Sequence, residues 1–246
     1  MTIIKGYGII CAYKKGDIMT RDIKKKLTEF FEKYKDYLEE DDLDYACDNL
    51  DDYLSGSVDT DVISQVAYAI GEHPNFKTRY EIFLDFLKDN NGLDKDILEV
   101  ACGGYPILSD MIDKEQTRMG KGSITGIDPL LMTTNLGNIH LFRENFTLDT
   151  DVSGYQLITG HYPCEATLDI IRSANEADKD FTIALCGCTH LDGFYMFMPG
   201  GVSYLTWMHT IDKVAQDTKN PDRIVDFVDV DGLEYPILLS KKKTIH

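Results

Sequence analysis

The stretch that decides the fold is Asp96–Pro106, Asp-Ile-Leu-Glu-Val-Ala-Cys-Gly-Gly-Tyr-Pro. A short apolar run interrupted by Glu99 is typical of a buried strand, and the glycines after Cys102 end it. Pro106 suits the start of a helix, where its missing N–H is not needed. The pattern therefore predicts a strand, a glycine turn and a helix. In such a unit, backbone N–H groups and the positive helix end can contact a ligand.

This stretch resembles motif I of the class I S-adenosylmethionine-dependent methyltransferases. Glu99 stands at the acidic position of the motif and Gly103 at its middle glycine, whereas Ala101 and Tyr105 replace the outer glycines. The resemblance implies that Glu99 influences the amino acid end of the cofactor and that the turn backbone packs against it. A plain strand-to-helix turn remains the alternative. The residues implied in cofactor binding here are Glu99, Ala101, Cys102, Gly103 and Gly104.

From Asp94 onward, short apolar runs alternate with helical patterns, which predicts an α/β domain with a parallel sheet. A terminal hairpin is expected around Asp231-Gly232. This order of elements resembles the class I fold, a Rossmann-like sheet with a terminal antiparallel hairpin. Further strands are expected at 123–128, 139–146, 155–161 and 181–187, and a helix at 203–218.

Polar residues follow the second and third expected strands. Asp128, with Pro129 after it, ends the second strand, where an acid suits ribose hydroxyls. Its alternative role is to cap the next turn. By the family resemblance, Asn145 and Phe146 border the adenine, although Phe146 fits ordinary core packing equally well.

The fourth expected strand ends in Gly160-His161-Tyr162-Pro163. Open parallel sheets place chemistry at this edge, and the class I family puts its acceptor-facing motif here. Gly160 is assigned to the cofactor site. His161 is the candidate general base because its unperturbed pKa of about 6.5 suits proton removal near neutrality. A purely structural histidine is the alternative, and Tyr162 either stacks on the acceptor or walls the pocket.

Cysteine and histidine residues follow the fourth and fifth expected strands. Because adjacent strand ends meet at one edge, His161, Cys164, Cys186, Cys188 and His190 could approach one another. Sulfur and imidazole ligands suit zinc. However, the spacing is not that of a zinc finger, and small buried thiols are the commoner reading. No metal is assigned, and a zinc-containing enzyme of the same architecture stays an alternative.

Three regions are expected along the chain. Residues 19–92 carry four amphipathic stripes that predict a helical N-terminal cap, and residues 93–246 form the methyltransferase-like domain. Residues 1–18 are either an upstream leader, with translation starting at Met19, or a short hairpin.

Composition limits the partners of the chain. The 246 residues carry a formal charge of −17, which repels phosphate backbones and disfavours nucleic acid. Neither a signal peptide nor a membrane-spanning run is evident, and six cysteines in this length favour reduced thiols in the cytoplasm. A nicotinamide fingerprint, a serine-hydrolase elbow and a phosphate loop are absent from the sequence.

The sequence as a whole predicts an S-adenosylmethionine-dependent methyltransferase with a small-molecule or protein acceptor. A non-catalytic module that binds S-adenosylmethionine or a nucleoside is the main alternative, because the glycine pattern is incomplete.

Overall fold

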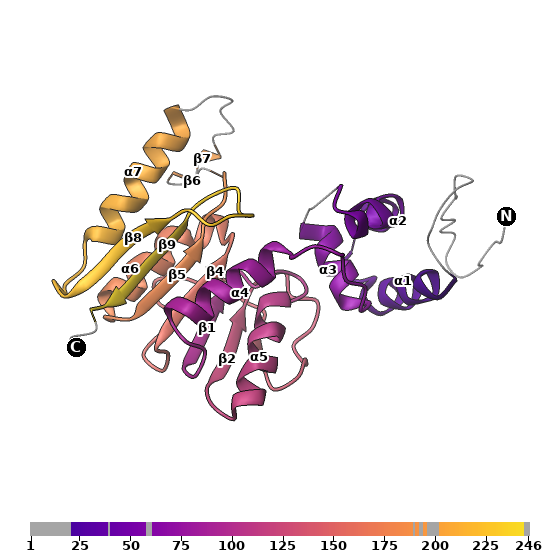
Figure 1. Ribbon diagram of the computed structural model, residues 1–246, viewed down its shortest axis with the longest axis horizontal. Coiled ribbons are helices and arrows are strands. Elements are labelled where there is room, and N and C mark those ends of the chain that lie inside the picture. The colour runs from indigo at the N-terminus through magenta and orange to yellow at the C-terminus, as the bar shows by residue number, and fades with distance from the viewer. Residues whose placement is uncertain are drawn as a thin grey trace. The chain divides into compact units, whose positions relative to one another are not determined.

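The computed structural model describes residues 21–38, 40–57, 61–188, 190–191, 194–195 and 202–243 (Figure 1). The chain divides into two compact units, Met1–Thr78 and Arg79–His246. The leader or hairpin expected over residues 1–18 lies outside the described residues.

The first unit contains three helices, α1 (Arg21–Tyr34), α2 (Glu40–Ser55) and α3 (Asp61–Ala69). Both α1 and α2 contact α3, and Lys26 pairs with Glu72 at 2.7 Å. The apolar faces are buried at the spacing of amphipathic helices; they comprise Leu27, Phe30, Phe31, Tyr34, Ala46, Leu50, Tyr53, Ile63, Val66 and Ala67.

The fourth amphipathic stripe forms α4 (Arg79–Asn90), which belongs to the second unit. The sequence placed the boundary near residues 90–94, whereas the division falls between Thr78 and Arg79. The helix packs on α5, and its Phe83 and Tyr80 rings contact His161 at the end of a sheet strand. Helical periodicity shows which face of α4 is buried, but it does not show which partner buries it.

The second unit is built on a seven-stranded sheet with the order β3-β2-β1-β4-β5-β9-β8. The first five strands are parallel, and β9 runs antiparallel to both β5 and β8. This order is that of the class I methyltransferase fold, so the predicted α/β fold class with its terminal antiparallel hairpin is confirmed. The strands are β1 (Asp96–Val100), β2 (Ser123–Ile127), β3 (His140–Phe142), β4 (Leu157–His161), β5 (Asp180–Ala184), β8 (Arg223–Val228) and β9 (Ile237–Lys242).

A separate two-stranded sheet pairs β6 (His190–Leu191) with β7 (Phe194–Tyr195). The helices of this unit that follow α4 are α5 (Ile107–Met119), α6 (Thr167–Glu176), which a 3₁₀ turn η1 (Cys164–Ala166) precedes, and α7 (Val202–Gln216).

The order of strands reverses between β1 and β4. Helix α5 joins β1 to β2, and α6 joins β4 to β5 in the opposite direction across the sheet. Right-handed crossovers therefore place the two helices on opposite faces. In Figure 1, α4 and α5 lie in front of the strands, while α6 packs on β4, β5 and α7. The point of reversal is where open α/β sheets bind ligands, outside the carboxyl ends of the strands.

The third and fifth strands end well before the positions that the sequence predicts. The third contracts to His140–Phe142, so that Asn145 and Phe146 lie in the loop beyond it. The fifth ends at Ala184, after which the backbone N–H of Leu185 donates to the carbonyl of Pro236. Apolar runs continue past the point where the sheet hydrogen bonds stop, because loop residues also enter the core.

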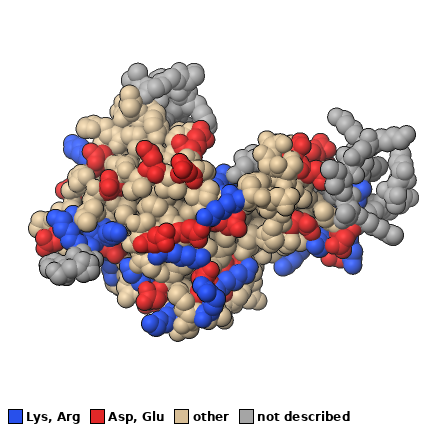
Figure 2. Space-filling view, in the orientation of Figure 1, with Lys and Arg blue, Asp and Glu red and all other residues tan. Residues whose placement is uncertain are grey.

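The surface of the described residues carries both signs of charge. On the face drawn in Figure 2, acidic and basic side chains are interspersed. No helix in the described ranges has the length and the apolar character that a bilayer crossing requires.

Candidate cofactor and acceptor site

The turn after β1 holds a strained backbone. Ala101 has φ of 58° and Gly103 has φ of 82°, both in the left-handed region. Glycine adopts this region without strain, which explains why a glycine is common at the position of Ala101 in the class I motif. The turn is anchored because the N–H of Ala101 donates to the carbonyl of Ile127 at 2.9 Å.

Asp128 fastens the turn to the end of β2. Its Oδ2 accepts a hydrogen bond from the N–H of Gly103 at 2.9 Å, and its Oδ1 accepts one from the N–H of Leu130 at 2.7 Å. The second bond is the turn-capping role that the sequence left open. Each carboxylate oxygen can accept a further bond, so the group retains capacity for hydroxyl donors.

Glu99 lies inside the fold rather than at its surface. It is 1% exposed, and the hydroxyl of Ser109 on α5 donates to its Oε2. Burial raises the pKa of Glu99 to about 7, and the hydroxyl of Ser109 opposes this increase. Glu99 therefore links β1 to the first turns of α5, and its carboxyl group is already engaged.

The residues expected around adenine separate into two environments. Phe146 is buried in a core cluster with Val100 and Ile127, whereas Asn145 is exposed. Leu130, two residues after Asp128, is 73% exposed, and Phe142 at the end of β3 is also exposed. The sequence interpretation named Pro129, which is exposed, and did not consider Leu130, an apolar residue just beyond the acid at the strand end.

Glycine at position 160 permits close packing of β4 on β1. A Cβ there would lie 3.0 Å from the Pro163 side chain and 3.1 Å from the carbonyl oxygen of Val100. These contacts are tighter than ordinary van der Waals packing, and they bring the tip of β4 next to the tip of β1. The predicted residues at these two tips are thus brought together.

His161 is enclosed by aromatic rings. Its ring stacks on Tyr162 with centroids 4.3 Å apart and lies 4.4 Å from Tyr80. The side chain is 6% exposed, and its Nε2 has no hydrogen-bond partner among the described residues. Burial, with a contribution from the Arg79 guanidinium, lowers the pKa of His161 to about 3. The sequence favoured His161 as a general base because of the ordinary pKa of histidine. That reason does not apply to this buried side chain.

Arg79 and Tyr80 lie beside the candidate site, and the sequence interpretation did not name them. The Arg79 guanidinium carbon lies 5.5 Å from the ring centres of both Tyr80 and Tyr162, within cation–π range. The sequence did not reveal that they lie near His161, because the helix that carries them, α4, was assigned to the N-terminal cap.

Three thiols gather beyond β4 and β5. The Sγ atoms of Cys164, Cys186 and Cys188 all lie within 4.8 Å of one another. Cys164 and Cys186 share a hydrogen bond at 3.6 Å, which raises the pKa of Cys164 and lowers that of Cys186. His161 is not part of this group, and the side chain of His190 is outside the described residues.

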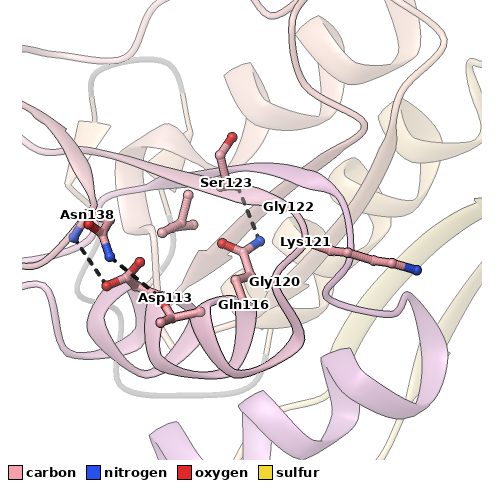
Figure 3. A pocket seen from close by; sticks show the side chains of 9 residues that line it. Asp113, Gln116, Gly120, Lys121, Gly122, Ser123 and Asn138 are labelled. Carbon is pink, nitrogen blue, oxygen red and sulfur yellow. Dashed lines mark hydrogen bonds between the residues drawn. The ribbon is translucent and has the colours of Figure 1, made fainter.

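A polar hollow of about 340 Å³ lies at the opposite edge of the sheet (Figure 3). Its walls come from the end of α5, the start of β2 and Asn138. The side-chain amide of Gln116 donates there to the carbonyls of Leu93 and Lys95. Because this hollow adjoins the amino end of β2, it is separate from the candidate site at the carboxyl ends.

The comparisons with known proteins return solved structures only. No protein-family model matches the chain, and no curated protein matches it. A methyltransferase from Pyrococcus furiosus aligns at 13% identity over 70% of this chain and 87% of its own, with a TM-score of 0.46. The CMeT domain of the citrinin polyketide synthase aligns at 12% identity over 91% and 70%, with a TM-score of 0.45. Precorrin-6y C5,15-methyltransferase from Geobacter metallireducens GS-15 aligns at 9% identity over 61% and 80%, with a TM-score of 0.34.

Likeness at these identities and scores concerns the fold alone and identifies no substrate. The class that the strand order defines is the class I methyltransferase fold.

Proposed function

We propose that this protein is an S-adenosylmethionine-dependent methyltransferase with a small-molecule or protein acceptor. The observation that carries the proposal is the hydrogen bond from the Gly103 N–H to Asp128, at the tips of two strands beside the reversal of strand order. A carboxylate and a glycine turn fixed together at that point form a cradle for a nucleoside.

The residues present fit the adenosyl part of this cofactor. The remaining lone pairs of the Asp128 carboxylate would accept hydrogen bonds from the ribose hydroxyls. The backbone at Gly103 and Gly104 would lie against the cofactor. Leu130, next to Asp128, offers an exposed apolar surface that suits the face of the adenine ring. The side chain of Asn145 would form a hydrogen bond with the edge of that ring. Glu99 fits less well, because its carboxyl group is buried against Ser109.

Methyl transfer requires little chemistry from the side chains of the protein. When bound, the cofactor supplies a methyl group that its sulfonium already activates. The protein must align the acceptor and exclude water. Tyr162 and Arg79 form the wall nearest the tip of β4, and the ring of His161 supports Tyr162 from behind. A base is required only for an acceptor that carries a proton at the reacting atom.

Calorimetric titration with S-adenosylmethionine tests the cofactor, and Leu130→Gln tests the assigned adenine surface. Because Leu130 is mostly exposed, the substitution should leave the unfolding temperature unchanged and weaken cofactor binding by about 3- to 10-fold through lost apolar contact. The matched control is Leu205→Gln on α7, which is 68% exposed and distant in sequence. Absence of any heat of binding in the wild-type chain would overturn the proposal.

A non-catalytic binding module is the second candidate, and Tyr105 at the third glycine position favours it. Transfer of isotope-labelled methyl from the cofactor to fractionated small molecules or proteins separates the two. Tight binding without transfer to any fraction would favour the module, whereas a labelled fraction identifies the acceptor class.

A further inference from the structure

We propose that Cys164, Cys186 and Cys188 bind one Zn²⁺ ion through three thiolate ligands. The proposal does not depend on the proposed methyl transfer.

The sheet brings the three thiols together. In the register of the parallel pair β4 and β5, His161 stands opposite Ala184. The chain leaves both strands at the same edge, so Cys164 and Cys186 follow within three residues of their strand ends. Proximity of these side chains is thus a property of the fold rather than of one flexible loop.

The sulfur spacing suits a tetrahedral ion. Zinc–sulfur bonds of about 2.3 Å at tetrahedral angles separate the sulfur atoms by about 3.8 Å. The Sγ atoms of Cys164 and Cys186 are 3.6 Å apart, and the third thiol lies within 4.8 Å of both. A disulfide requires about 2.05 Å, so these distances describe separate thiols. Small side-chain rotations would complete the triangle.

The backbone around the thiols is held in a special conformation. Cys164 has φ of 45° and Tyr162 has φ of 56°, a region that residues with side chains rarely adopt. Gly187, between the other two cysteines, passes so close to Tyr235 that a Cβ would lie 2.1 Å from the tyrosine hydroxyl. Such constraints persist where the surrounding structure enforces them, often at ligand sites.

Cys102 provides an internal contrast. It is a single buried thiol that behaves as a small apolar side chain, as is common for free cysteine. The three clustered thiols are instead half-buried and face one another. Thiolates are preferred ligands of zinc, and the described residues supply three of them at one place.

Metal analysis of the untagged full chain, purified without chelator, tests the site. We expect about one zinc per chain in the wild type and less than about a tenth of that in Cys164→Ser and in Cys188→Ser. Cys102→Ala, which removes a thiol outside the cluster, should retain the metal. Circular dichroism would show whether each variant is folded.

Cobalt titration of the reduced, metal-free chain supplies the second measurement. Thiolate coordination should produce a sulfur-to-cobalt charge-transfer band and strong visible bands, both lost in Cys186→Ser. The proposal is overturned if the wild type neither contains zinc nor yields these bands. It is also overturned if alkylation and mass spectrometry find Cys164 joined to Cys186 in the protein as purified. Since neither readout involves S-adenosylmethionine, the result is independent of the proposed methyltransferase function.

Discussion

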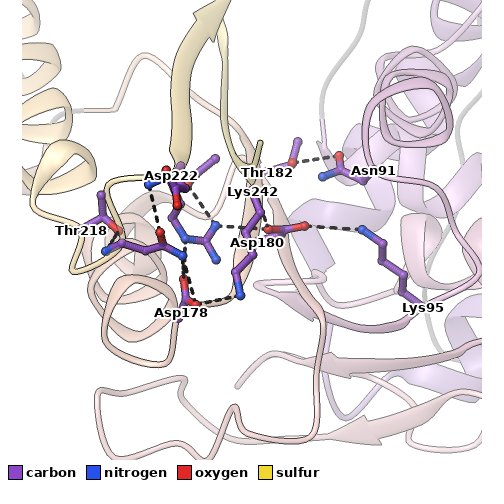
Figure 4. Close-up of polar contacts among 11 residues, drawn as sticks. Asn91, Lys95, Asp178, Asp180, Thr182, Thr218, Asp222 and Lys242 are labelled. Atoms are coloured by element: carbon purple, nitrogen blue, oxygen red, sulfur yellow. Dashed lines mark hydrogen bonds and ion pairs between the residues drawn. The ribbon is translucent and has the colours of Figure 1, made fainter. Parts of the chain in front are cut away.

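The amino ends and the carboxyl ends of the parallel strands, on opposite sides of the same sheet, are built differently. At the amino ends of the parallel strands, Arg223 donates from Nε to Asp178 at 2.9 Å and from Nη1 to Asp180 at 3.2 Å, and Lys242 pairs with Asp178 at 2.7 Å (Figure 4). Lys95 approaches Asp180 from the start of β1. These contacts tie the terminal hairpin to the parallel strands.

The carboxyl ends of the parallel strands hold a buried carboxyl group with a raised pKa, a buried imidazole with a lowered pKa, and left-handed backbone at Ala101, Tyr162 and Cys164. Left-handed backbone is not exclusive to this edge, since Asp178 also has a positive φ. Ion pairs at the amino ends stabilise the fold, whereas strained and buried ionisable groups such as those at the carboxyl ends often cluster at functional sites.

Arg223→Ala should produce the largest effect. The Arg223 side chain is fully buried, and its removal leaves two carboxylates with one partner fewer. We expect a loss of about 3 kcal/mol in the free energy of unfolding. Urea denaturation measures it, and Arg172→Ala, in an exposed pair with Asp169, should cost under about 1 kcal/mol. Equal costs for the two variants would contradict the stabilising role of the amino edge.

Glu99 should make stability depend on pH. Its folded pKa of about 7 exceeds the ordinary 4.5, so the folded state favours the protonated form. This contribution is complete below pH of about 4.5 and is lost as pH rises through about 7, with a total of up to about 3 kcal/mol.

Glu99→Gln keeps an acceptor for Ser109 and removes the titration. The variant should therefore lose less stability than the wild type between about pH 5 and pH 8. Thermal unfolding at a series of pH values measures this difference. Parallel curves for the two proteins would show that Glu99 does not titrate in this range.

Asp128→Ala should weaken cofactor binding by about 10- to 100-fold, because hydrogen bonds to a charged group are lost. Calorimetry measures the affinity, and the unfolding temperature reports any loosening of the turn that Asp128 fastens. The matched control is Asp226→Ala, at an exposed position of β8. Unchanged affinity in Asp128→Ala would remove the ribose assignment.

His161→Phe should have the smallest effect. The ring packs between aromatic neighbours, and the substitution removes a buried nitrogen that has no partner. We expect a change in unfolding free energy within about 1 kcal/mol at pH 7. Methyl transfer should persist if the ring only supports Tyr162. A folded variant that has lost transfer would instead restore the role of general base.

The sequence alone determined the local elements of this protein. The run Asp96–Pro106 predicted a strand, a turn and a helix, and the structure contains β1 and α5 in those places. Gly120, in the left-handed conformation, ends α5, as glycines commonly end helices. Such features depend on residues a few positions apart, which is why periodicity and turn chemistry reveal them. The order of strands and helices then indicated the fold.

Tertiary structure decided what these elements contact. Helix α4 has an ordinary amphipathic pattern, yet it packs in the sheet unit and brings Arg79 and Tyr80 to the tip of β4. The low pKa of His161 arises from burial among residues distant in sequence. Cys164 meets Cys186 because two parallel strands end side by side. Burial and electrostatic environment are sums over neighbours in space, so a linear pattern predicts the residue types but not these properties.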